Sequence, residues 1–358
     1  MQGQKNMPES PIKVLVVDDS AFMRRVIISM LENDSEIDVI GYARDGQDAL
    51  NKISKLKPDV ITLDVEMPKM DGIETLKNIM CSNPLPVVML SAHTRDGAHQ
   101  TLQALELGAV DFVAKPEGIA NMQALAGELP HKLKVAAGAE VTRKCTPLAP
   151  ILEKKTDEKV ISVSRPIEVV AIGTSTGGPT ALQTVLTSLP HNLPVGVVVV
   201  QHMPKGFTGP LANRLNELSA LEVKEAEEGD RIAPGKVLIA PAGYQMQFAR
   251  KGAGVTVTLS ENSPIKTLFK PSVDVMLLSL AKVYGGTCLG VILTGMGNDG
   301  TKGLKELKKL GATVLAQDKD SCVVYGMPRS AVEAGVVDKT VTLSEMGNEI
   351  VKLINRSS

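Results

Sequence analysis

The sequence predicts an α/β protein of two domains, each built on a parallel β-sheet. Short aliphatic runs alternate with amphipathic segments twice along the chain, first over residues 12–138 and again over 167–354. A polar, proline-containing stretch, 139–166, separates the two series. The length of 358 residues also fits two domains of about 150 residues each.

Five aliphatic runs in the first series have the length and β-branched content of buried strands. They are Val14–Val17, Val39–Tyr42, Val60–Leu63, Val87–Leu90 and Phe112–Ala114. Helical patterns lie between them at Ala21–Asn33, Gly46–Lys55, Gly72–Met80 and Thr101–Leu107. This alternation predicts a parallel sheet with helices on both faces, here a flavodoxin-like (βα)5 domain.

The second series predicts a doubly wound, mostly parallel sheet. Its expected strands are Glu168–Gly173, Val195–Gln201, Cys288–Leu293 and Ala312–Ala316. Residues 235–259 have a shorter period and turn signals, which predict antiparallel hairpins inserted in that sheet. The charge cluster and prolines of 139–166 favour an extended linker.

Composition excludes several classes of protein. A net charge of −1 gives no electrostatic basis for binding nucleic acid, and 3% aromatic residues with no Trp provide few surfaces for stacking bases. The N-terminus lacks the apolar core of a signal peptide, and no apolar run is long enough to span a bilayer. We therefore expect a cytoplasmic protein that neither binds nucleic acid nor inserts into membranes.

Polar residues mark the ends of the strands in the first series. Asp18 and Asp19 follow one strand, and Asp64, Ser91 and Lys115 end three others. Carboxyl ends of parallel strands share one edge, so the three carboxylates would repel one another without a cation, for which Mg²⁺ is the preferred ion. The hydroxyl and the ammonium suit a transient phosphoryl group. The alternative is that these acids are only solvated helix caps.

The stretch "AIGTSTGGP" places Ser175 between a strand and a helix that begins near Pro179. A helix N-terminus favours negative charge, whether of a phosphate ligand or of an oxyanion. Residues 173–177 fit the nucleophile-elbow pattern GxSxG, and the lysine of a phosphate-binding P-loop is missing. The loop alone leaves both interpretations open.

A serine nucleophile needs a base and an acid that orients it. Of five histidines, only His202 ends a long strand, and Asp299 follows another strand of the same series. With Ser175 they would share one sheet edge, which predicts a Ser-His-Asp triad. Alternatively, His202 is a satisfied polar cap and Asp299 is the N-cap of a helix starting near Thr301. The order Ser, His, Asp differs from that of α/β-hydrolases, so the elbow does not predict that fold.

Residues 12–117 resemble a response-regulator receiver domain. The resemblance is carried by the acidic pair, by Asp64 in "LDVEMPKMDG", and by Ser91, Phe112 and Lys115. It implies that a partner histidine kinase supplies the phosphoryl group and that Asp64 accepts it with Mg²⁺. Asp18, Asp19 and Asp64 would hold the metal, and Ser91, Phe112 and Lys115 would switch on phosphorylation.

The motifs "AIGTSTGGP", "QHMPKGFT", "KPSVD" and "LTGMGNDG" resemble, in this order, the catalytic domain of the CheB family of chemotaxis methylesterases. With the receiver, the resemblance covers residues 12–350. It implies that Ser175 is the nucleophile, His202 the base and acid, and Asp299 its orienting partner. It also implies that backbone N–H groups of Thr176 and Met296 form the oxyanion hole.

The implied reaction is hydrolysis of glutamate γ-methyl esters on methyl-accepting chemoreceptors, through an acyl-enzyme and with release of methanol. Some members of the family also deamidate receptor glutamines. The resemblance further implies that the unphosphorylated receiver restricts access to the catalytic face.

One departure from the family pattern concerns residues 269–270, where Phe269-Lys270 replaces the usual His-Arg before "PSVD". We expect this change to alter substrate positioning and the response to pH. Two other functions remain open from the residues alone. The second domain could be a docking module without catalysis, or a phosphate- or nucleotide-binding domain that uses "GTSTGG" as an anion cradle.

Overall fold

The computed structural model describes residues 10–92, 94–116, 119–139, 141, 165–252 and 254–357. The chain forms two compact units, Met1–Leu152 and Glu153–Ser358. Most of the predicted linker, 139–166, lies outside the described residues, so its limits stay a prediction. Within the described ranges, no helix has both the length and the apolar character needed to cross a membrane.

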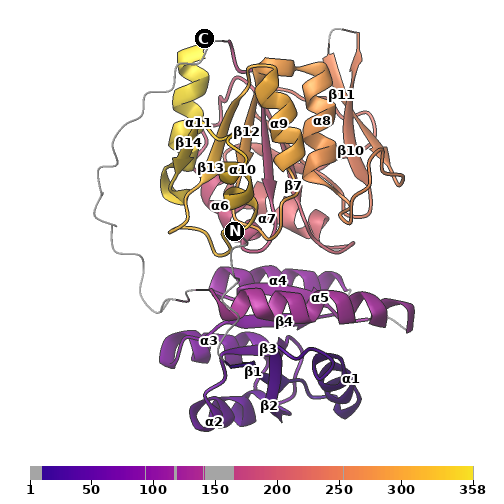
Figure 1. Ribbon diagram of the computed structural model, residues 1–358, viewed down its shortest axis with the longest axis vertical. Helices are drawn as coiled ribbons and strands as arrows, with labels where there is room; N and C mark the ends of the chain where they lie inside the picture. The colour runs from indigo at the N-terminus through magenta and orange to yellow at the C-terminus, as the bar shows by residue number, and fades with distance from the viewer. Residues whose placement is uncertain are drawn as a thin grey trace, which may run out of the picture. The chain divides into compact units, whose positions relative to one another are not determined.

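The first unit is a five-stranded parallel sheet in the order β2-β1-β3-β4-β5 (Figure 1). Helix α1 packs against α5, while α3 packs against α2 and α4, so the two sets cover opposite faces. The elements are β1 (Ile12–Val17), α1 (Ala21–Leu31), β2 (Ile37–Ala43), α2 (Gly46–Leu56), β3 (Val60–Asp64), α3 (Gly72–Ser82), β4 (Val87–Ser91), α4 (Arg95–Leu107), β5 (Asp111–Ala114) and α5 (Ile119–Ala137). The predicted (βα)5 fold is confirmed.

Helices α1 to α4 each begin at a side chain that caps the first turn. Ser20, Asp45, Asp71 and Thr94 accept a hydrogen bond from the backbone N–H three residues further on. The cap at Thr94 starts α4 before the predicted Thr101. The sequence did not predict this, because the first turn of α4 is polar and has no apolar periodicity.

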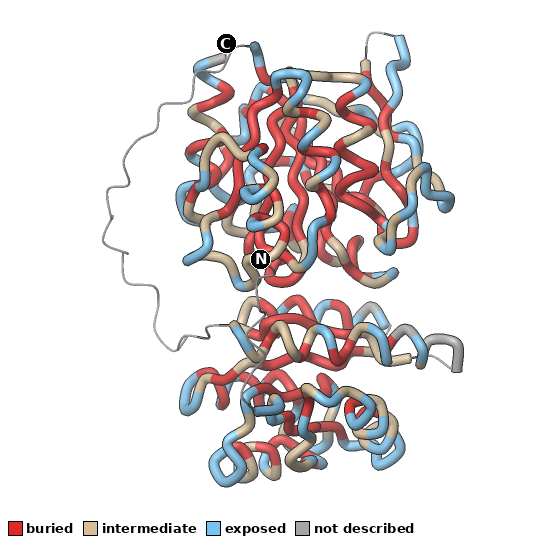
Figure 2. The backbone as a smooth tube through the Cα atoms, viewed as in Figure 1, coloured by how far each residue is buried: buried red, intermediate tan, exposed pale blue. Residues whose placement is uncertain are grey.

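The second unit contains a seven-stranded parallel sheet in the order β14-β13-β12-β6-β7-β9-β8. Figure 2 shows the strands as the buried interior, and the exposed residues lie on the helices and loops around them. The elements are β6 (Val169–Thr174), α6 (Gly178–Thr187), β7 (Gly196–Gln201), α7 (Thr208–Leu218), β8 (Glu222–Glu225), β9 (Lys236–Ile239), β10 (Gln245–Lys251), β11 (Gly254–Ser260), α8 (Val273–Val283), a 3₁₀ turn (Gly285–Thr287), β12 (Cys288–Ile292), α9 (Thr301–Lys309), β13 (Thr313–Gln317), α10 (Met327–Glu333), β14 (Lys339–Val341) and α11 (Leu343–Ser357).

The hairpin prediction for residues 235–259 is partly wrong. Strand β9 is a parallel member of the main sheet, paired with β7 and β8, and its run Val237–Ile239 is buried as central parallel strands are. Among the strands that the structure describes, β10 and β11 are the antiparallel pair, and they form a separate two-stranded sheet. This hairpin packs on α8 and so lies outside the main sheet.

The direction of the strand order changes at β6, with β7 on one side and β12 on the other. Ligands of open α/β sheets bind outside the carboxyl ends of the strands at such a point. Gly177 has φ +76° at the cap of α6, and a Cβ there would lie 2.7 Å from Val323. Glycine therefore permits both the turn after β6 and the close approach of the loop that covers it.

Candidate functional site

The first unit gathers three carboxylates at the carboxyl ends of β1 and β3. Ligand oxygens of Asp18, Asp19 and Asp64 all lie within 4.8 Å of one another. Lys115, after β5, contacts Asp64 Oδ2 at 2.6 Å and Asp18 Oδ2 at 2.9 Å. Three carboxylates with one ammonium leave excess negative charge, so the cluster is consistent with a Mg²⁺ site.

Asp64 is almost completely buried, and its pKa is raised from 3.8 to about 6. Burial is the main cause and the charge of Asp18 adds to it, while Lys115 opposes both. Lys115 stays cationic because the attraction of Asp64 and Asp18 outweighs its own burial and raises its pKa. The pocket therefore disfavours the ionised form of Asp64. A divalent cation bound there would stabilise that ionised form.

Two of the predicted switch residues lie on β4 and β5, the strands next along the sheet from β3. Ser91 is buried, and its hydroxyl donates to the carbonyl of Gly97 at 3.0 Å at the start of α4. Phe112 is buried in β5, and Lys132 Nζ lies 5.3 Å from the centre of its ring. In this state the Ser91 hydroxyl is thus engaged with α4.

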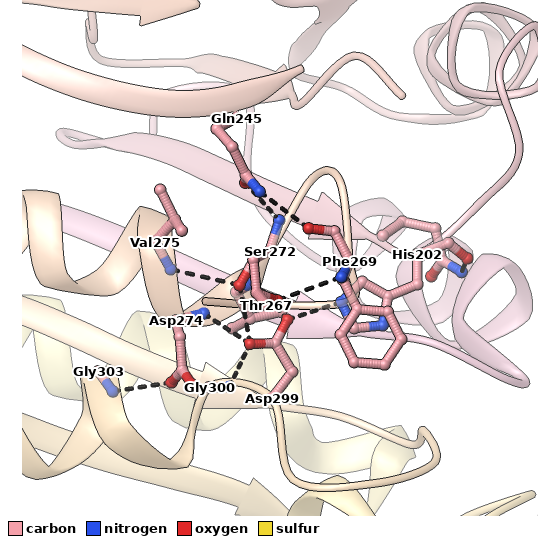
Figure 3. A network of polar contacts seen from close by, with 12 residues as sticks. His202, Gln245, Thr267, Phe269, Ser272, Asp274, Val275, Asp299, Gly300 and Gly303 are labelled. Atoms are coloured by element: carbon pink, nitrogen blue, oxygen red, sulfur yellow. Dashed lines mark hydrogen bonds and ion pairs between the residues drawn. The ribbon is translucent and has the colours of Figure 1, made fainter. Parts of the chain in front are cut away.

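In the second unit, His202 and Asp299 are in direct contact (Figure 3). His202 Nε2 lies 2.8 Å from Asp299 Oδ2, and both side chains are more than nine-tenths buried. His202 Nδ1 is also buried and has no hydrogen-bond partner among the described residues. The interpretation of His202 as a fully satisfied polar cap is therefore wrong.

The Asp299 carboxylate receives a dense set of hydrogen bonds. Oδ2 also accepts from the N–H of Val273 at 2.7 Å, and Oδ1 accepts from Ser272 Oγ, Asp274 N and Gly300 N at 2.9, 3.0 and 3.1 Å. Most of these donors lie at the N-terminus of α8, which favours a negative charge. Asp299 is therefore not the N-cap predicted for the helix at Thr301, whose cap is Gly300, and serves α8 instead.

These contacts fix the ionisation of Asp299. Burial raises the pKa of this carboxyl, but the His202 contact and the backbone N–H bonds together outweigh burial and hold the pKa below 3.8. An ionised carboxylate only accepts hydrogen bonds, so His202 Nε2 is the donor between them. In a neutral imidazole this tautomer leaves a lone pair on Nδ1.

Ser175 follows β6 directly, and His202 follows the neighbouring strand β7. The register pairs Thr174 with Gln201, so Ser175 and His202 are the next residues on each strand. The Gln201 amide Nε2 donates to the carbonyls of both, at 2.9 and 3.0 Å. Among the described residues, no hydrogen bond joins the Ser175 hydroxyl to His202. The structure thus brings His202 and Asp299 into contact and leaves Ser175 as their neighbour.

The two residues predicted for the oxyanion hole lie in the loops that follow β6 and β12. Thr176 is buried in the turn before α6, and its carbonyl accepts from Thr294 Oγ1 at 3.0 Å. Met296 lies in the loop after β12, and that loop approaches Ser175 closely. A Cβ at Gly295 would be 2.8 Å from Ser175 Cβ. Thr176 is thus the next residue after the serine, and Met296 follows the glycine that approaches it.

Sequence reasoning missed three residues of this region. Gln201 links the backbones of Ser175 and His202, and its signal was a polar side chain ending a run of four valines. Gln245 is fully buried on β10 and holds the segment before α8. Phe269 was noticed as a departure, but its contact with His202 was not predicted. No local pattern indicates contacts between residues so distant in the chain.

Comparison with known proteins agrees with these observations. The family model described as CheB methylesterase matches residues 170–350, and that of the response regulator receiver domain matches 14–126. Proteins named protein-glutamate methylesterase/protein-glutamine glutaminase are 46% identical in Moorella thermoacetica and 48% identical in Geobacillus kaustophilus. These alignments cover 96% of this chain and, respectively, 98% and 99% of the relatives.

A solved structure supports the match of the second unit. The Thermotoga maritima CheB methylesterase catalytic domain is 43% identical and aligns with a TM-score of 0.51, covering 52% of this chain and 98% of that one. Fold and site thus define a response regulator whose receiver is joined to an α/β effector domain of the methylesterase type. The chain belongs to the CheB family of receiver-containing protein-glutamate methylesterases.

Proposed function

We propose that this enzyme hydrolyses glutamate γ-methyl esters of chemoreceptors with Ser175 as nucleophile, His202 as general base and acid, and Asp299 as the orienting carboxylate. The observation that carries the proposal is the state of His202. Its Nε2 is held by an ionised Asp299, and its buried Nδ1 has no partner in the described chain, at the strand end next to Ser175. A buried nitrogen without a hydrogen-bond partner costs stability, so its presence here is best explained by a function.

In the first step, His202 Nδ1 takes the Ser175 hydroxyl proton while Oγ bonds to the ester carbonyl carbon. The imidazolium that forms is stabilised by Asp299, whose charge is fixed by the α8 N-terminus. Collapse of the tetrahedral intermediate breaks the bond to methoxide, which leaves as methanol with the proton from Nδ1. The glutamyl group is then an ester of Ser175.

Water resolves this acyl-enzyme by the same route, with His202 accepting its proton and returning it to Ser175. The developing oxyanion would bind the backbone N–H groups of Thr176 and Met296. Loss of one such donor costs about 3 kcal/mol of transition-state stabilisation. A glutamine side chain can follow the same steps with ammonia leaving, which accounts for the glutaminase activity named for the relatives.

The receiver would regulate this reaction through Asp64. Asp18, Asp19 and Asp64 fit Mg²⁺ because their carboxylate oxygens converge there with too little positive charge, and Asp18 and Asp64 are buried. When bound, Mg²⁺ would neutralise charge on the phosphoryl group and on its acceptor. Lys115 would contact the same phosphoryl group, and the Ser91 hydroxyl would leave Gly97 to bind it. The phosphodonor is a histidine kinase, and the substrates are methylated receptors.

A fluorophosphonate probe with mapping of the labelled peptide tests the proposed nucleophile. We expect labelling at Ser175 that is lost in Ser175→Ala and strongly slowed in His202→Ala. Matched controls are Ser188→Ala, at the other end of α6, and the exposed His191→Ala, and both should label normally. A docking module or an anion cradle predicts no labelling of Ser175, and labelling that is independent of His202 would contradict the proposed base.

A further inference from the structure

The imidazole of His202 lies against an aromatic ring that the reaction itself does not use. The rings of His202 and Phe269 are stacked, with their centroids 4.1 Å apart and their planes within 3° (Figure 3). Phe269 belongs to the segment between β11 and α8, and the neighbouring Leu268 is 97% exposed. One whole face of the candidate base is therefore covered by Phe269.

The hydrogen bonds of His202 do not by themselves fix its ring plane. Its side chain makes one hydrogen bond within the described residues, from Nε2 to Asp299. Rotation about the Cβ–Cγ bond moves Nδ1 through a wider arc than Nε2, so a bond at Nε2 restrains the direction of Nδ1 only loosely. A flat surface parallel to the imidazole opposes this rotation, because any tilt drives the ring into it.

Phe269 is itself held in place through its backbone. Its N–H donates to Thr267 Oγ1 at 3.1 Å, and its carbonyl accepts from Gln245 Nε2 at 2.8 Å. Gln245 Oε1 accepts from the N–H of Ser272 at 2.9 Å. Because Gln245 is fully buried, both of these bonds are shielded from water.

The same segment also holds Asp299. Ser272 binds the carboxylate through Oγ, and Val273 and Asp274 bind it through their N–H groups. Residues 269–274 therefore contact the base at one end and its orienting acid at the other, and Gln245 joins the two ends. We call this segment, 269–274, the clamp.

We propose that Phe269 is a positioning residue that keeps His202 Nδ1 directed at Ser175, and that Gln245 fixes the clamp that carries it. The proposal rests on the triad proposed above. It adds an explanation of what fixes the orientation of the His202 imidazole. It also excludes the substrate from the face of the imidazole that Phe269 covers.

The test distinguishes the effect of the flat aromatic face of Phe269 from the effect of its apolar volume. Phe269→Leu and Phe269→Met remove the flat face and keep an apolar side chain, whereas Phe269→Tyr keeps the ring. Phe248→Leu is the matched control, because Phe248 is a buried ring on β10 that packs in the core. Methanol release from methylated receptor gives kcat and KM for the full-length variants, and the rate of fluorophosphonate labelling reports on Ser175 directly.

We expect Phe269→Leu and Phe269→Met to lower kcat and the labelling rate roughly ten- to a hundredfold, as misdirected catalytic groups do. KM should change by less than about threefold, because a positioning residue acts on the transition state and not on uniform binding. Phe269→Tyr should restore kcat to within about threefold of the wild-type enzyme, and Phe248→Leu should lower the melting temperature with little change in kcat. Gln245→Leu should lower kcat in the same direction as Phe269→Leu.

Several outcomes would overturn the proposal. Unchanged kcat in Phe269→Leu and Phe269→Met would show that the stack does not orient the base. Equal losses in Phe269→Leu and Phe269→Tyr would show that the flat face is not what matters. A rise in KM at constant kcat would place Phe269 on the substrate. Failure of the wild-type enzyme to release methanol or to label would instead reject the proposed triad.

Discussion

Asp64 and Asp299 both lie beyond the carboxyl edge of a parallel sheet, Asp64 at the end of β3 and Asp299 in the loop after β12, yet their environments have opposite effects on their charge. Asp64 ends β3, is nearly completely buried, and has a pKa raised to about 6. Asp299 follows β12, is buried to a similar extent, and has a pKa held below 3.8. Burial opposes ionisation at both positions, so the difference comes from what surrounds each carboxylate.

Asp299 has a full set of hydrogen-bond donors around its carboxylate, and Asp64 does not. Three backbone N–H groups, one hydroxyl and the imidazole bind Asp299. Asp64 has one backbone N–H, one ammonium and a neighbouring carboxylate of like charge. A strand-end aspartate with a full set of donors is a permanent charge that can orient a base. An aspartate that lacks these donors is suited to bind a cation and to receive a phosphoryl group.

The largest effect expected from this comparison concerns Asp299→Asn. The amide cannot accept from Nε2 in the same tautomer without losing other bonds, and it no longer stabilises the imidazolium. We expect kcat for methanol release to fall on the order of 10³–10⁴-fold, the size seen when an orienting aspartate of a triad becomes asparagine.

Asp274→Asn is the matched control for Asp299→Asn, because it removes a neighbouring carboxylate and keeps the backbone N–H through which residue 274 binds Asp299. Asp274 is a neighbouring buried carboxyl whose Oδ1 accepts from Gly303 N at 2.9 Å, and the figures place it away from the imidazole (Figure 3). It should retain kcat within about threefold. Equal losses in the two variants would mean that the charge of Asp299 has no special role.

A smaller effect is expected in the receiver for Asp64→Asn. The wild-type enzyme should respond to Mg²⁺ and a small-molecule phosphodonor with roughly tenfold activation, which requires only about 1.4 kcal/mol of differential stabilisation. Asp64→Asn should keep the basal rate and lose the response, as measured by methanol release. A variant that still responds would show that Asp64 is not the acceptor.

The last effect is on stability and not on rate, and it should have opposite signs at the two aspartates. The pKa of Asp64 is raised in the folded state, so ionisation lowers the free energy of unfolding as pH rises from about 4 to 6. In EDTA, Asp64→Asn should therefore be more stable than wild type at pH 7, by roughly 1–3 kcal/mol, and similar to it below pH 4.

The pKa of Asp299 is lowered in the folded state, so its contribution is fully present above its usual pKa of 3.8 and is lost as pH falls through the lower, folded-state value. Asp299→Asn should therefore be less stable than wild type at pH 7. Denaturant unfolding of the full-length variants at pH 7 and pH 4 measures both. Destabilisation by both substitutions at pH 7 would remove the contrast between the two sites.

The sequence predicted the central strands well because they are continuous apolar runs. Val14–Val17 and Val197–Val200 are buried on both faces, and such runs have few alternatives in an α/β protein. The edge strands β8 and β14 were missed because they are short and polar. An edge strand needs only alternate residues to be buried, so it shows no continuous apolar run. The hairpin β10–β11 was predicted, but its separation from the main sheet depends on packing against α8.

The candidate site was predictable as far as strand ends determine it. Asp18, Asp64 and Lys115 meet as expected, and so do His202 and Asp299, because chain direction alone brings these residues to one edge. The donors that fix Asp299 lie about 25 residues earlier in the chain, at the start of α8. Their contact depends on tertiary packing, which neither periodicity nor a motif encodes.

The central claim is that a Ser175-dependent esterase is controlled by a phosphorylatable receiver. The measurement that tests it most directly is methanol release from methylated chemoreceptor, with and without Mg²⁺ plus a phosphodonor, with Ser175→Ala as control. We predict release that rises with the donor and disappears in Ser175→Ala. Release that persists in Ser175→Ala, or that ignores the donor in the wild-type enzyme, would contradict the account.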